Sequence, residues 1–110
     1  MTSWYENISS DLLPEIFNEV EFPGWALEHA AIVETSVMMY YTPDLVHENR
    51  IVDEGLDAVP TYYRFPPSKT LIPSSGSLHT ARSSSAEKGK IIVENVMKNI
   101  NEYLQDEFEM

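Results

Sequence analysis

GWALEHAAIVETS, residues 24–36, decides the predicted fold, because it opens a helix signal that few charges interrupt. The run from residue 26 to residue 41 is rich in Ala, Ile, Val and Met. Pro43 stands just past its end, where a proline commonly stops a helix. The pattern therefore predicts a helix over residues 26–41. Much of this helix should be buried, since it carries so few charged side chains.

The same stretch concentrates chemically active side chains. Trp25, Glu28 and His29 stand at i, i+3 and i+4, which would place them on one helical face. A histidine moves protons near neutral pH, a glutamate accepts hydrogen bonds and a tryptophan covers a planar ring. Two interpretations stay open: a pocket mouth lined by these three residues, or a packed tryptophan beside a solvated Glu–His pair. Metal ligands on one helix often stand at i and i+4, but Val33 occupies that position after His29 and Glu34 lies one residue further.

Two more helices are expected. An apolar stripe at helical spacing predicts the first, which a Phe-Pro-Gly break at residues 22–24 ends; its members are Leu13, Ile16, Phe17 and Val20. Ser84-x-x-Glu87 resembles a capping box and predicts an amphipathic helix over residues 86–107. The stripe of this last helix consists of Ile92, Val96, Ile100, Tyr103 and Leu104.

Little strand is available to cover these helices. Residues 3–5 look like the end of a strand, and residues 61–65 are a plausible extended piece. Otherwise residues 42–83 are rich in proline and serine, so this part either wraps a larger body or forms a functional loop. Apolar helix faces must be buried against another layer, which we expect a partner or further chain to supply.

The composition limits the possible partners and surroundings. A chain of 110 residues is normally one domain. Its 18 acidic and 7 basic residues give a net charge of −11, which argues against nucleic acid and anionic membranes as partners. There is no cysteine for disulfides or thiolate metal sites, and the N-terminus has no signal-peptide pattern. We expect a soluble protein of the cytoplasm.

Motifs along nearly the whole chain resemble the C-terminal part of the creatininase (creatinine amidohydrolase) family. They are SWY at 3–5, GWALEHAAIVETS at 24–36, PDLV at 43–46, RIVD at 50–53, GSL at 76–78 and SAEKG at 85–89. The resemblance implies a three-layer α/β/α fold, of which this chain would form mostly helices, short strands and a long Pro-rich loop. Residues 1–110 would be the C-terminal part of a creatininase-like domain that lacks its N-terminal metal-binding half.

The resemblance also implies roles for individual residues. His29 matches the histidine that moves protons to the leaving nitrogen, and Glu28 matches a glutamate that contacts the substrate. Trp25 matches a tryptophan of the substrate pocket, and Glu34 matches a buried glutamate that supports the site. Tyr5 stands where the family has its second pocket tryptophan.

One further difference concerns the substrate. Ala26 replaces a residue that is often acidic in creatininases proper. This change and the tyrosine in the pocket put creatinine itself in doubt, and relatives act on other small amides.

The metal ligands of the family lie in an E-x-H segment and a G-H-x-x motif, and this sequence contains neither. We therefore expect the chain alone to bind no metal, and Zn or Mn to be held by the complete family site, where a metal-bound water attacks the amide. The resulting hypothesis is half of a metal-dependent amidohydrolase that is inactive alone. It would be completed by the missing N-terminal half or assembled as a homo-oligomer, for which the resemblance implies a hexamer. One alternative is a non-catalytic interaction protein. A free-standing enzyme using Glu28, His29 and Glu34 would lack a nucleophile and a metal set.

Overall fold

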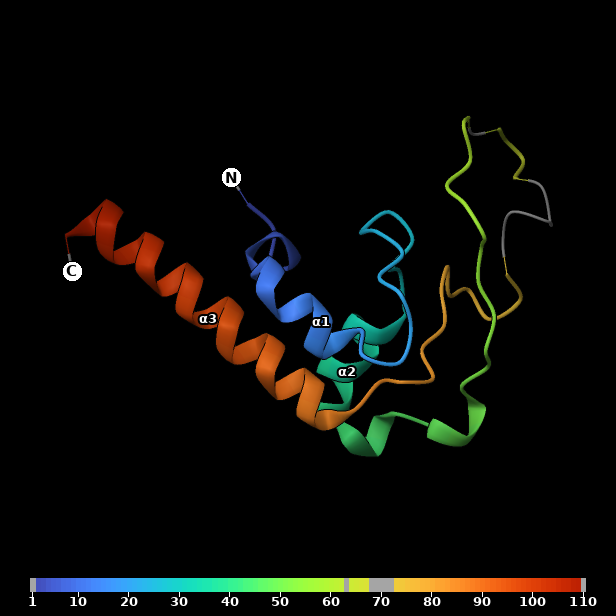
Figure 1. Cartoon of the computed structure of the whole chain (residues 1–110), viewed down its shortest axis with the longest axis horizontal. Coiled ribbons are helices and arrows are strands. Elements are labelled where there is room, and N and C mark those ends of the chain that lie inside the picture. Colours follow the sequence, from blue (N-terminus) through green and yellow to red (C-terminus); the bar gives the residue numbers. More distant parts are fainter. Residues whose placement is uncertain (1, 63, 68–72, 110) are drawn as a thin grey trace.

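The computed structural model describes residues 2–62, 64–67 and 73–109, and within these ranges it contains helices and loops but no strand (Figure 1). The elements in chain order are η1 (Tyr5–Asn7), η2 (Ser10–Leu12), α1 (Leu13–Ile16), α2 (Ile32–Tyr41), η3 (Pro43–Leu45), η4 (Glu48–Arg50) and α3 (Ala86–Phe108), where η marks a 3-10 helix. The three-layer α/β/α arrangement and the short strands expected from the sequence are therefore not seen among the described residues. No described helix is long and apolar enough to cross a membrane.

The core lies where α1 and α2 pack against the first half of α3 (Figure 1). Ile16, Ile32 and Ile92, one from each helix, are completely buried. Gly89 lets α2 and α3 approach closely, since a Cβ atom there would overlap the Ser36 carbonyl oxygen. The two helices thus meet backbone to backbone at this crossing.

The predicted strand end at residues 3–5 is wrong. Trp4 has helical dihedral angles, φ −61° and ψ −41°, and η1 begins at the next residue. A local hydrogen bond stabilises this turn, because the Ser3 N–H donates to the Glu6 carboxylate at 2.7 Å. This local bonding favours a turn of helix over an extended chain.

The first predicted helix is only four residues long. It ends at Phe17, whose φ of −102° and ψ of 53° are not helical. The Phe17 ring packs on Phe22 with ring centroids 4.8 Å apart, so a tertiary contact turns the chain early. The apolar stripe was nevertheless read correctly, because Leu13, Ile16 and Val20 all lie in or against the core.

The second predicted helix begins six residues later than expected. Residues 25–27 form a turn, in which the Leu27 N–H donates to the Gly24 carbonyl at 3.2 Å. Ala30 has a positive φ of 51°, which no right-handed helix can contain, so α2 starts only at Ile32. The predicted end is confirmed, since α2 stops before Pro43. Its burial is only partial, because Tyr41 is 62% exposed.

The long middle segment folds back onto the rest of the chain. No strand forms at positions 61, 62, 64 and 65, and Tyr63 lies outside the described residues. The Leu78 N–H donates to the His29 carbonyl at 3.1 Å, and the Leu56 N–H donates to the Leu78 carbonyl at 2.8 Å. Leu78 therefore binds the turn before α2, and Leu56 binds Leu78.

The last predicted helix is confirmed to within one residue at its end. The N-cap is Ser85, one residue later than predicted, and its hydroxyl accepts from the Lys88 N–H at 3.1 Å. The Ser84 hydroxyl instead donates to the Ile32 carbonyl at 3.4 Å. Asn99 still contacts η1, where its amide donates to the Asn7 carbonyl at 2.7 Å. Beyond that point α3 projects from the body (Figure 1) and exposes Tyr103, Leu104 and Phe108.

Candidate functional site

One cavity, of about 320 Å³, gathers all five side chains that the sequence singled out. It lies between η1, the turn before α2 and the first turns of that helix. Its lining consists of Trp4, Tyr5, Trp25, Ala26, Glu28, His29, Val33, Glu34 and Leu78. The expected grouping of Trp25, Glu28 and His29 is thus found. The predicted shared helical face is wrong, because these residues lie in and just after a turn that precedes α2.

Aromatic rings form one wall of this cavity. Tyr5 packs edge to face on Trp4, with ring centroids 6.2 Å apart, and tilts against Trp25 at 5.7 Å. Trp25 is held from behind by the edge of Phe22 at 5.0 Å. Trp4 is the aromatic lining residue that the sequence did not predict. A wall of this kind favours planar or cationic groups.

Glu28 supplies a buried carboxyl group to the cavity. Its Oε1 accepts a hydrogen bond from the Val33 backbone N–H at 2.8 Å, while its Oε2 is buried with no protein partner. The residue is 7% exposed, and desolvation by burial raises its pKa to about 7 against the opposing effect of the Val33 hydrogen bond. Glu28 can therefore accept or donate a hydrogen bond near neutral pH.

His29 is exposed at the cavity, and hydrogen bonds to its neighbour fix the chain that carries it. The Ala30 N–H donates to Glu34 Oε2 at 2.5 Å, and the Ala30 carbonyl accepts from the Ser77 hydroxyl at 3.0 Å. Glu34, expected to be buried, is half-buried and holds this turn directly. Ser77 was not singled out from the sequence, since nothing in its local pattern indicates a contact 47 residues away.

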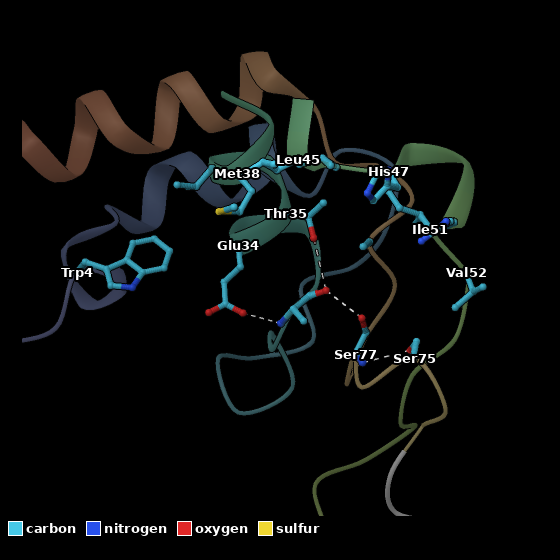
Figure 2. A pocket seen from close by; sticks show the side chains of 15 residues that line it. Trp4, Glu34, Thr35, Met38, Leu45, His47, Ile51, Val52, Ser75 and Ser77 are labelled. Carbon is cyan, nitrogen blue, oxygen red and sulfur yellow. Dashed lines mark hydrogen bonds between the residues drawn. The ribbon is translucent and has the colours of Figure 1, made fainter. Parts of the chain in front are cut away.

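A second, larger cavity of about 730 Å³ adjoins the first (Figure 2). The two share Trp4 and Glu34 as lining residues. Figure 2 shows Glu34 and Ser77 bonded to the same backbone segment from two sides. The walls are mainly apolar, with His47 and Arg50 as the basic members.

The described residues do not fit a metal pair. Within residues 2–62, 64–67 and 73–109 there is no group of three or more His, Asp or Glu side chains that could hold a metal ion.

Comparisons with known proteins give a consistent assignment. The family model described as creatininase, creatinine amidohydrolase, matches residues 7–104. A creatinine amidohydrolase of Pseudomonas putida is 38% identical over 87 residues, which are 79% of this chain and 34% of that protein. The chain thus spans about a third of the curated relative.

Solved structures agree with this match. A mutant creatininase complexed with creatine is 32% identical and superposes with a TM-score of 0.89, covering 97% of this chain and 42% of that one. A manganese creatininase and a mutant creatininase of the Zn-Zn type match with the same identity, coverage and TM-score. On this evidence the chain belongs to the creatininase family.

Proposed function

We propose that residues 1–110 act as the C-terminal part of a creatininase-like domain and supply the substrate pocket of an amidohydrolase that cleaves a C–N amide bond. Family membership supports a metal-dependent amidohydrolase at the level of the family. The observation that carries the proposal is the single cavity lined by Tyr5, Trp25, Glu28, His29 and Glu34. The substrate is a small cyclic or linear amide.

Each lining residue has a chemistry that suits this reaction. Trp25 and Tyr5 offer aromatic faces to a planar amide. Glu28 receives an N–H of the substrate on its unpaired Oε2. His29, exposed and carried on a fixed turn, protonates the nitrogen that leaves. Glu34 keeps this turn in place through the Ala30 N–H.

The Zn or Mn of the family site would be held outside this chain. The described residues offer no ligand set, and the relatives are two to three times longer than the matched part. We therefore propose that the N-terminal half of a creatininase-like domain completes the site, or that copies of the chain associate as a homo-oligomer, as large as a hexamer. The exposed apolar end of α3 is available for such contacts. A cytoplasmic location stays a prediction.

Complementation tests this proposal. The chain is co-expressed with the part of the Pseudomonas putida relative that it does not match. The purified material is assayed for Zn and Mn and for hydrolysis of a panel of small amides that includes creatinine. We expect a complex that holds metal and cleaves at least one amide. His29→Ala should lower kcat by roughly 100-fold or more with the complex intact, since a positioned acid contributes about this much.

Two results would contradict the proposal. A metal-loaded complex that cleaves no amide in the panel would leave the pocket without its proposed role. Unchanged turnover in His29→Ala would remove the proposed acid, and with it the reason for assigning catalysis to this cavity. The first result would favour a non-catalytic interaction protein, whereas the second would mean that another group supplies the acid.

A further inference from the structure

Ala30 has a backbone conformation that its side chain disfavours. Its φ is 51°, in the left-handed region, where a Cβ atom crowds the following carbonyl oxygen. Glu109, another described residue of this kind, lies at the C-terminal cap of α3, where such a conformation is common. Ala30 instead lies beside the cavity, immediately after Glu28 and His29. A strained residue persists only where its surroundings fix it.

Side chains occupy both polar backbone groups of Ala30. Its N–H donates to Glu34, four residues later, at 2.5 Å. Its carbonyl accepts from the Ser77 hydroxyl at 3.0 Å and, more weakly, from the Thr35 hydroxyl at 3.5 Å (Figure 2). Glu34 and Thr35 belong to α2, whereas Ser77 comes from the long loop. The loop therefore contributes the shorter of the two hydrogen bonds to this carbonyl.

The loop is held firmly enough to act in this way. The Leu78 N–H donates to the His29 carbonyl at 3.1 Å, so consecutive loop residues bind consecutive carbonyls of the turn. Leu78 is bound in turn by the Leu56 N–H at 2.8 Å. Gly55 lies so close that a Cβ atom there would be 2.7 Å from the His79 Cα. Three chain segments are thus linked at the cavity.

We propose that Ser77 is a positioning residue of the pocket: with Glu34 it holds Ala30 in the left-handed conformation, and this fixes the direction in which Glu28 and His29 face the cavity. If Ala30 relaxed to a right-handed conformation, the chain would enter α2 in another direction. Glu28 would then lose its hydrogen bond from the Val33 N–H. The effect on catalysis rests on the proposed function, but the effect on the turn does not.

Ser77→Ala is the central variant, and Ala30→Gly is the specific rescue. Glycine adopts a positive φ without a Cβ penalty, so Ala30→Gly should need no hydroxyl to hold the turn. Ser77→Thr keeps the hydroxyl. Ser74→Ala is the matched control, since the Ser74 hydroxyl contacts only the exposed Glu54 carboxylate.

Two NMR measurements on the chain read out the turn without any activity. Ala30 Cα and Cβ chemical shifts report its backbone conformation, and the Glu28 carboxyl shift against pH reports its environment. Ser77→Ala should move the Ala30 shifts away from left-handed values and move the Glu28 midpoint from about 7 toward 4.5. Ser77→Thr and Ser74→Ala should change neither. Adding Ala30→Gly to Ser77→Ala should restore the Glu28 midpoint.

In the completed enzyme, Ser77→Ala should lower kcat/KM by roughly 10-fold to 100-fold, and Ala30→Gly should restore it. If complementation fails, the NMR results still decide the proposal, so its failure is distinct from that of the proposed function. Unchanged Ala30 shifts and an unchanged Glu28 midpoint in Ser77→Ala would overturn it. If Ser77→Ala does not fold, a folded double variant supports the proposal and an unfolded one overturns it.

Discussion

Glu28 caps α2 from outside the helix, through the hydrogen bond that its Oε1 accepts from the Val33 N–H at 2.8 Å. The N-cap residue itself, Ala31, has no side chain that could do so. The same burial that makes this bond possible leaves the Glu28 Oε2 without a partner and raises the pKa of the carboxyl group to about 7. One residue thus links the start of the helix, the cavity and the response to pH.

This link predicts a pH-dependent stability. Glu28 binds its proton more tightly in the folded chain than in the unfolded one, where its pKa is near 4.5. Its contribution to the free energy of unfolding is therefore fully present below pH 4.5 and is lost as the pH rises through about 7. The loss should be on the order of 2 to 3 kcal/mol. Glu28→Gln keeps an acceptor for Val33 and should flatten this part of the profile.

Urea unfolding between pH 4.5 and pH 8.5 measures the difference. Glu102→Gln is the control, because it removes the same charge from an exposed position of α3. The pH profile of the unfolding free energy of Glu102→Gln is subtracted from that of Glu28→Gln. This corrects for the general charge repulsion within a chain of net charge −11. If the unfolding free energy changed with pH by the same slope in both variants, the pKa of Glu28 would not be raised by folding.

The crossing of α2 and α3 predicts that Gly89→Ala destabilises the chain. Alanine favours a helix by about 1 kcal/mol over glycine, but here its Cβ would overlap the Ser36 carbonyl oxygen. Separating the helices should cost about 1 to 3 kcal/mol or more. Asn101→Ala, at an exposed position of the same helix, should not destabilise it. Thermal unfolding by circular dichroism tests both, and a higher Tm for Gly89→Ala would contradict the close crossing.

The N-terminal cap of α3 predicts that Ser85, and not the Ser84–Glu87 pair, stabilises the start of this helix. Ser85→Ala should lower the free energy of unfolding by about 1 kcal/mol, since the Lys88 N–H loses its acceptor. Ser85→Asp should retain it. Glu87→Ala should have a smaller effect than Ser85→Ala, because Glu87 is exposed and makes no capping bond to Ser84. If Glu87→Ala weakened the helix as much as Ser85→Ala, the predicted capping box of Ser84 and Glu87 would be supported instead.

These residues also show what the sequence can predict. The long amphipathic helix α3 was located to within one residue, because its apolar spacing and serine-rich start are local signals. The five site residues were identified through the family resemblance, and the structure gathers them in one cavity. Their helical spacing would have grouped only three of them, and for the wrong reason.

What the sequence could not predict depends on contacts between distant residues. Ala30 is a strong helix former by propensity, yet it delays the start of α2 because Glu34 and Ser77 hold it at a positive φ. Trp4 was missed because a local turn, not a strand, turns its ring toward Tyr5. The expected sheet of the α/β/α fold is not represented by any strand among the described residues.

The two tryptophans of the chain, Trp4 and Trp25, both line the cavity that contains Glu28, so intrinsic fluorescence should report its protonation. Emission followed against pH should show a transition with a midpoint of about 7. His29 lines the same cavity, and histidines also titrate in this range, so the measurement is made in a His29→Gln background. The transition should persist in His29→Gln and disappear when Glu28→Gln is added. A transition that survives both substitutions would mean that another group controls the aromatic wall, and a transition lost in His29→Gln alone would assign the pH response to the histidine.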